Sequence, residues 1–195
     1  NKDHITAEGD SVRMAYTVPS NLVAVGNGKL RNVKDLGDKT TYEWFVTNPI
    51  NNYNVSVQIG NYVAVQDTFV KDSKTHFMNH YVLDYNQELA SNFFPQSKEV
   101  IRFYEKYFGD YQWYEDGYKL IEVPYLGMEH QSAVTYGNGF SMYNGVRSKS
   151  WPMYGVIDPL IIHETGHEWF GNSVTASDPT HIWIHEGLQV YSESI

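Results

Sequence analysis

The sequence has no cysteine and an excess of acidic over basic side chains. Its 195 residues include 14 Lys plus Arg against 23 Asp plus Glu, a formal net charge of -9. Without cysteine there can be no disulfide or thiolate metal site, so any bound metal must be held by His, Asp or Glu. The acidic balance, with no basic cluster, excludes nucleic acid and anionic membrane surfaces as expected partners.

Long apolar runs are also lacking. A membrane-spanning helix requires roughly 20 consecutive apolar residues, and no stretch of the chain approaches this, so no transmembrane segment is predicted. Apolar side chains in shorter runs are plentiful: 42% of the residues are hydrophobic and 15% are aromatic. This composition predicts a folded protein with packed cores, in one domain or two small ones, and leaves the oligomeric state open.

The first third of the chain is typical of β-structure. Alternating and β-branched runs predict strands over residues 12–18, 22–25, 41–46 and 53–59. Gly26-Asn27-Gly28 marks a turn between two of them. We therefore expect residues 1–67 to form a β-sheet-rich N-terminal part.

After Asp67 the hydrophobic period changes. It predicts helices over residues 97–109, 156–170 and from 184 to the last residue, with short strands over 119–123 and 133–136. Residues 68–195 should therefore form a mixed α/β unit, which makes the fold class of the whole chain α+β.

Three pairs of histidines have i, i+4 spacing. They are His76 with His80, His163 with His167, and His181 with His185. On a helix this spacing puts two imidazoles on one face, with Cβ atoms about 6 Å apart, so that both can bind one ion. The spacing alone does not choose among the pairs.

The pair His163 and His167 is distinguished by Glu164, which follows its first member. His-Glu-x-x-His on a helix is the pattern of zinc hydrolases. Zinc lowers the pKa of a bound water towards ~7, and Glu164 would lie where it can take a proton from that water. Glu164 is therefore the predicted general base.

A third ligand must come from another element, because catalytic zinc sites of this type use two histidines and one carboxylate. Glu186 opens the next apolar helical stretch, and eighteen residues separate it from His167. This gap lets the chain end one helix, turn and return beside it. We predict one Zn²⁺ per chain, held by His163, His167 and Glu186.

The other two pairs are interpreted differently. Nothing near His76 and His80 in the sequence supplies a third ligand or a base, so surface or packing roles are expected for them. His185 adjoins Glu186 and is a candidate outer partner of the metal site in preference to a direct ligand.

Taken together, these motifs resemble the aminopeptidase N and leukotriene A-four hydrolase family of gluzincins. The resemblance rests on the His163-to-Glu186 spacing, on the run Trp169-Phe170-Gly171-Asn172 behind the first motif, and on an upstream segment. In that segment, Gly127-Met128-Glu129 is similar to part of the family's Gly-x-Met-Glu-Asn motif.

The resemblance implies a zinc-dependent aminopeptidase that acts on peptides with a free N-terminus. Glu129 takes the position of the glutamate that grips the substrate α-amine, and the backbone of Gly127 and Met128 is expected to pair with the substrate as an added strand. By the same resemblance, residues 1–67 are the end of an N-terminal saddle domain. Residues 68–195 are then the first, incomplete part of a thermolysin-like catalytic domain.

The sequence departs from the family pattern at several positions. Leu126 and His130 replace the Gly and Asn of the amine-binding motif, and two histidines replace the usual Asp and Asn before Glu186. Asp178 or a backbone carbonyl is expected to orient a ligand imidazole instead. The family's transition-state tyrosine would lie beyond Ile195, so we expect this chain to be part of a longer enzyme with little activity alone.

Two functions from other classes stay open on the sequence. A non-catalytic peptide-binding module would need Glu129 but would not need Glu164. A family-related epoxide hydrolase would use the same zinc on a lipid substrate.

Overall fold

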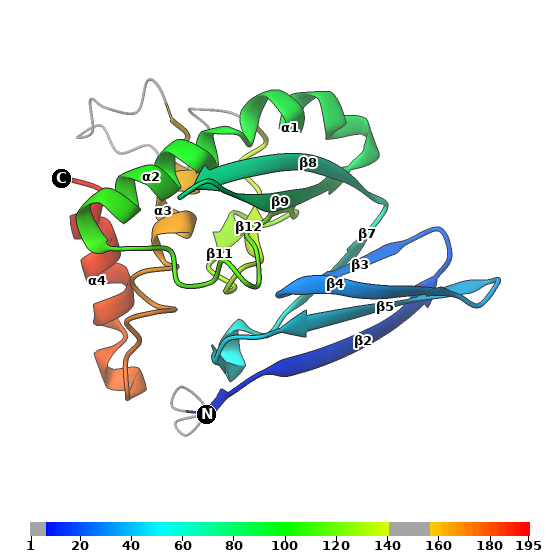
Figure 1. The fold of residues 1–195 in the computed structure, drawn as a ribbon, viewed down its shortest axis with the longest axis horizontal. Helices are drawn as coiled ribbons and strands as arrows, with labels where there is room; N and C mark the ends of the chain where they lie inside the picture. Colours follow the sequence, from blue (N-terminus) through cyan, green and yellow to red (C-terminus); the bar gives the residue numbers. More distant parts are fainter. Residues whose placement is uncertain (1–6, 141–156) are drawn as a thin grey trace.

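The computed structural model describes residues 7–140 and 157–195. Figure 1 shows two regions, a β-region built from the N-terminal strands and a second region in which helices pack around another sheet. In the described ranges, no helix combines the length and the apolar character needed to cross a membrane.

The β-region consists of antiparallel pairs. Its strands are β1 (Glu8–Gly9), β2 (Val12–Pro19), β3 (Val23–Gly26), β4 (Lys29–Asp35), β5 (Lys39–Val46), β6 (Ile50–Asn51) and β7 (Val57–Gly60). Strand β5 lies between β2 and β4, while β3 pairs with β7 and β1 with β6.

Three of the four predicted N-terminal strands correspond to β2, β3 and β5, with ends that agree within two residues. The fourth prediction, residues 53–59, is right only in its second half, because Asn52–Asn54 form a 3-10 turn before β7. Strand β4 was not predicted. All its residues are exposed, so it lacks the apolar alternation that burial of one face would impose.

The second region is built on a five-stranded sheet in the order β11-β12-β10-β9-β8. Its strands are β8 (Tyr62–Lys71), β9 (Lys74–Leu83), β10 (Leu120–Glu122), β11 (Gly127–Met128) and β12 (Val134–Tyr136). Strand β10 runs parallel to both of its neighbours, whereas β11 is antiparallel to β12 and forms one edge.

The expected end of β-structure at Asp67 comes too early. Strand β8 continues past this residue and turns through Asp72 and Ser73, both with positive φ, directly into β9. Such a two-residue turn matches the twist of the strands it joins. The predicted domain boundary after residue 67 falls inside β8, and the division at that point stays a prediction.

The described residues of the second region also form the α-helices α1 (Gln87–Phe93), α2 (Gln96–Phe108), α3 (Pro159–Gly166) and α4 (Trp183–Ser192). The predicted helix over 97–109 matches α2, and α4 begins one residue before its predicted start. Helix α3 is shorter than the predicted 156–170, because the chain leaves it in turns around Gly171, whose φ is +132°. Val156, the predicted start, lies outside the described residues.

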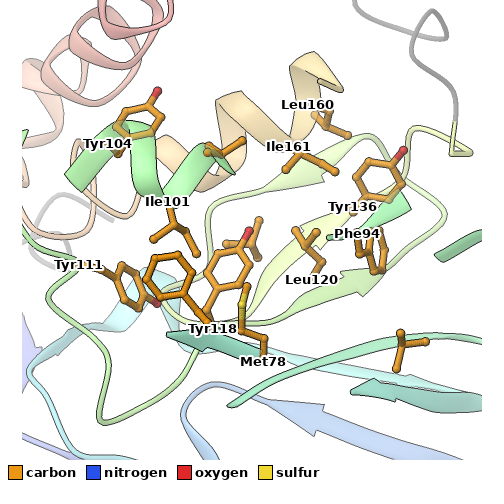
Figure 2. Packing of buried hydrophobic residues seen from close by; sticks show 14 of the residues in the cluster. Met78, Phe94, Ile101, Tyr104, Tyr111, Tyr118, Leu120, Tyr136, Leu160 and Ile161 are labelled. Carbon is orange, nitrogen blue, oxygen red and sulfur yellow. The ribbon is translucent and has the colours of Figure 1, made fainter. Parts of the chain in front are cut away.

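The central sheet is covered on both faces. On one face, side chains from β9, β10, β12 and the helices form the larger core, labelled in Figure 2. On the other face, Tyr81 and Ile121 pack against Trp44 and Val46 of the β-region. Fully burying an Ile or a Leu stabilises the fold by roughly 1.5–3 kcal/mol, so both cores fix the sheet that positions the site.

Candidate metal centre

Helix α3 has a defined start. The Asp158 carboxylate accepts a hydrogen bond from the Leu160 backbone N–H at 2.8 Å, and Pro159 occupies the first turn, where its missing N–H costs nothing. Asp158 is itself held by the Tyr136 hydroxyl of β12, which donates at 2.7 Å. The helix is thereby fixed against the sheet, which sets where His163 lies.

His163 and His167 face the same side of this helix. His167 caps α3 with φ -61° and ψ -18°, still in the helical range, so the i, i+4 relation holds. The two Nε2 atoms are 3.2 Å apart.

Glu186 reaches the same point from the first turn of α4. Its Oε2 lies 3.5 Å from His163 Nε2 and 3.7 Å from His167 Nε2. Tetrahedral zinc with bonds of about 2.0–2.2 Å holds its ligand atoms roughly 3.3–3.6 Å apart. The three side chains therefore fit one zinc ion, and in the described part of the chain they are the only such group of ligands.

The second nitrogen of each imidazole also has a partner. His163 Nδ1 lies 2.7 Å from Glu193 Oε1, and His167 Nδ1 lies 2.8 Å from the Phe170 carbonyl oxygen. A proton on each Nδ1 leaves both Nε2 lone pairs free for a metal, the usual arrangement around bound zinc. These partners thus select the tautomer that zinc requires.

The electrostatics of the group favour a cation. Burial lowers the pKa of His163, but hydrogen bonds to Glu186 and Glu193 outweigh burial and raise that pKa to about 10. Hydrogen bonds to His163 and His167 in turn hold the pKa of Glu186 well below its usual range. Two carboxylates around two imidazoles thus favour positive charge at the point where a metal would bind.

Glu164 lies on the same helix and is nearly buried. Burial is the main cause that raises its pKa to about 7, and the charge of Glu129 acts in the same direction. Its carboxylate lies against β11: a Cβ added at Gly127 would be only 2.5 Å from Glu164 Oε1. A side chain at position 127 would displace the Glu164 carboxylate, so glycine lets the carboxylate and the strand approach this closely.

Strand β11 brings the amine-binding candidates to the sheet edge beside Glu164. Gly127 and Met128 pair with β12 on one side, and within residues 7–140 and 157–195 no other strand pairs with their opposite edge. Glu129 follows directly and is 9% exposed. Helix α3 and this edge together bring the predicted base, the two candidate histidine ligands and an acidic side chain into one area.

Comparison with known proteins decides the family. The family described as the peptidase family M1 domain matches residues 90–195, more than half of the chain. This chain belongs to peptidase family M1. The membership confirms the resemblance drawn from the histidine and glutamate motifs.

Curated relatives of this M1 chain carry aminopeptidase names. It is 25% identical over 186 residues to aminopeptidase M1-D of Oryza sativa subsp. japonica, covering 92% of this chain and 20% of the relative. It is 33% identical over 106 residues to human endoplasmic reticulum aminopeptidase 2, covering 51% and 10%. The chain thus spans about a fifth or less of these relatives.

The fold agrees with that of solved structures. The M1 zinc metallopeptidase from Deinococcus radiodurans matches with a TM-score of 0.75 at 18% identity, covering 94% of this chain and 39% of the other. This likeness confirms the predicted α+β architecture, with a β-rich part followed by a mixed α/β part.

The remaining histidine pairs of the M1 chain do not join the site. His76 and His80 lie on strand β9, and His80 Nδ1 accepts a hydrogen bond from the Leu120 N–H at 2.9 Å inside the core. His181 is exposed, whereas His185 is buried and its Nε2 accepts from the Ala176 N–H at 2.9 Å. His185 therefore connects α4 to the preceding loop. None of its described hydrogen bonds reaches His163 or His167.

Sequence reasoning missed Glu193 as the partner of His163. Asp178, the candidate named for orienting an imidazole, is exposed and instead accepts hydrogen bonds from Thr180. The other candidate, a backbone carbonyl, is realised by Phe170 for His167. A signal for Glu193 was present, because it follows Glu186 by seven residues and so lies two turns further along the same helix face.

Proposed function

We propose that this chain carries the metal-binding and amine-binding parts of a zinc-dependent aminopeptidase site. The observation that supports this most strongly is the meeting of His163, His167 and Glu186 beside the buried Glu164. A non-catalytic peptide-binding module would gain nothing from a carboxylate placed there.

His163, His167 and Glu186 would hold one zinc ion. When bound, zinc supplies a Lewis acid that makes water a nucleophile near neutral pH. Glu193 and the Phe170 carbonyl keep the two imidazoles in the tautomer that presents Nε2 to the metal.

Glu164 acts as general base and then as general acid. Its buried carboxylate accepts a proton from the attacking water and delivers it to the nitrogen of the leaving amine. Burial raises the pKa of Glu164 to about 7, so both protonation states are accessible near neutral pH. The absence of a side chain at Gly127 leaves room for this carboxylate beside β11.

The edge of β11 binds the substrate. Backbone groups of Gly127 and Met128 pair with an extended peptide irrespective of its side chains. Glu129 forms an ion pair with the α-ammonium group, which limits cleavage to the first peptide bond. The aminopeptidase names of the curated relatives support this substrate class.

The proposal is tested with matched substrates on the full-length protein loaded with zinc. An amino-acid anilide with a free amine should be cleaved at least about 100-fold more efficiently than its N-acetyl derivative, because only the free amine forms an ion pair with Glu129. Equal rates on the two substrates would contradict the proposed aminopeptidase activity. Hydrolysis of a lipid epoxide, with no cleavage of either anilide, would favour the epoxide hydrolase.

For the 195 residues in isolation we expect zinc binding but little turnover. The family resemblance places the tyrosine that stabilises the transition state beyond Ile195, and loss of one oxyanion donor costs about 10²–10³ in kcat. Robust hydrolysis by the isolated chain would contradict this expectation.

A further inference from the structure

The segment from Glu129 to Ser132 follows β11 and is held by buried side chains from both regions of the molecule. It contains the acidic side chain assigned to the substrate amine, and one backbone hydrogen bond, from Ala133 N–H to the His130 carbonyl at 2.8 Å, closes its turn. Ser132 has φ +58°, a conformation that a non-glycine residue keeps only when its surroundings hold it. The contacts around this segment therefore decide where Glu129 lies.

From the side of the metal ligands, Asn172 makes the decisive contacts. Its backbone N–H donates to the His167 carbonyl at 3.0 Å, and its Nδ2 donates to the Glu129 carbonyl at 2.9 Å. One buried residue thus connects the backbone of a metal ligand to the backbone of the amine-binding residue. The same Nδ2 also donates to Glu168 Oε2 at 3.1 Å.

Glu168 holds the other end of the segment. It is 1% exposed, and its Oε1 accepts the Ser132 backbone N–H at 2.7 Å. Lys119 Nζ donates to the Ser132 carbonyl at 2.8 Å, and the Ser132 hydroxyl accepts the Gly28 N–H at 2.9 Å. All three polar groups of Ser132 are thereby engaged, which explains how its unusual backbone conformation persists.

From the β-region, Asn54 supports Asn172. Asn54 Nδ2 donates to Asn172 Oδ1 at 2.7 Å across 118 positions of sequence, and Asn54 is fully buried. Asn27, also fully buried, donates from Nδ2 to the carbonyls of Asn54 and Gln131 at 3.0 and 2.7 Å. The amide of Asn172 is therefore oriented by the β-region, so that its Nδ2 points to Glu129.

We infer that Asn172 is a positioning residue that sets the spacing between the metal ligands and Glu129, and that Asn54 of the β-region holds it in place. The inference rests on the proposed function, because it takes Glu129 as the group that binds the substrate amine. On this account the β-region contributes to recognition of the N-terminus without contacting the substrate.

The test is Asn172→Asp in the full-length protein loaded with zinc. The substitution keeps the size of the side chain, replaces the donor to Glu129 and Glu168 with an oxygen, and keeps an acceptor for Asn54. We expect kcat/KM for the free anilide to fall about 10- to 100-fold, mainly through KM, since small misplacements of a binding group have effects of this size. The rate on the N-acetyl anilide and the zinc affinity should change less than about twofold, because neither depends on Glu129.

Asn54→Ala is the second variant and Asn48→Ala its matched control. Asn54→Ala removes the hydrogen bond by which the β-region orients Asn172, so the preference for the free amine should fall by about threefold to tenfold. Asn48 also joins the two regions, donating from N and Nδ2 to the Asp116 carboxylate at 3.1 and 2.8 Å, and none of its described hydrogen bonds reaches residues 129–132. Asn48→Ala should leave the preference unchanged.

The outcomes separate the inference from the proposed function. If the wild-type protein shows no preference for the free amine, the proposed function fails. If the wild type shows the preference and folded Asn172→Asp and Asn54→Ala both retain it in full, the inference fails. If Asn172→Asp does not fold, Asn54→Ala decides, with the melting temperature and zinc content as evidence of an intact site.

Discussion

Strand β9 and helix α3 each carry two histidines with the same spacing, yet only the pair on α3 brings its two imidazoles together. On the strand, four residues span about 13 Å. His76 packs against the Tyr114 ring at a tilt, with centroids 4.0 Å apart, while His80 lies in the core. On the helix, the two Nε2 atoms of His163 and His167 are 3.2 Å apart. The spacing has a chemical meaning only once the secondary structure is known.

Their electrostatic surroundings differ as much as their geometry. Burial lowers the pKa of His80 to about 4, and the opposing charge of Asp67 does not outweigh it. For His163, carboxylates on α4 outweigh burial and raise the pKa to about 10. The core histidine is kept neutral, whereas the site on α3 favours a cation. Variants at each pair can test this contrast.

The largest effect is expected from Glu164→Gln, because this change removes the proposed general base. No such base is proposed for the histidine pair on β9. Loss of the general base should lower kcat by about 10³-fold, while zinc content stays at the wild-type level because Glu164 is not a ligand. Steady-state kinetics with metal analysis measure both. Undiminished turnover by the zinc-loaded Glu164→Gln variant would show that Glu164 is not the general base.

The next largest effect should come from replacing one histidine of each pair and comparing the zinc affinities of the two variants. His167→Gln is expected to weaken zinc binding at least about 100-fold, beyond the 10- to 100-fold typical of outer partners. His80→Gln should leave it unchanged. Zinc titration against a competing chelator gives both affinities, and equal losses in the two variants would show that the pairs are not distinct.

The third expected effect concerns the contribution of His80 to stability. Its pKa is about 4 in the folded state and about 6.5 when unfolded, so the unfolded chain binds more protons between these values. Stability should therefore fall as the pH drops from about 6.5 towards 4, by about 2 kcal/mol at pH 5 relative to neutral pH.

Urea unfolding at pH 7.5 and pH 5 measures this loss, with His80→Gln as the reference that lacks the titrating group. The free energy of unfolding should decrease more in the wild type than in the variant. The same decrease in both proteins would show that His80 is not the neutral core histidine described.

The smallest expected effect is that of Glu193→Gln. Glutamine can still accept a hydrogen bond from His163 but carries no charge, so zinc affinity should fall by about tenfold. Glu122→Gln is the control, since Glu122 also accepts hydrogen bonds, from Leu83 N and Asn86 Nδ2, on the second region but away from the histidines. An equal loss in both variants would point to a general effect of lost charge.

Much of the fold could be predicted where local pattern and burial agree. Alternating β2 and amphipathic α2 lie where predicted, because one face of each is buried. The hairpin of β8 and β9 was missed, and the exposed β4 shows no pattern at all. Exposed or polar strands acquire their conformation from pairing with a neighbour, which one stretch of sequence does not reveal.

The sequence by itself determined the two histidine ligands and the general base proposed for the site, because helical periodicity places His163, Glu164 and His167 about one turn apart or less. The same periodicity on α4 relates Glu186 to Glu193. Only the tertiary structure decided how these helices, the edge of β11 and the β-region meet. Contacts such as that between Asn54 and Asn172 join residues 118 positions apart, and they exist because two cores pack on opposite faces of one sheet.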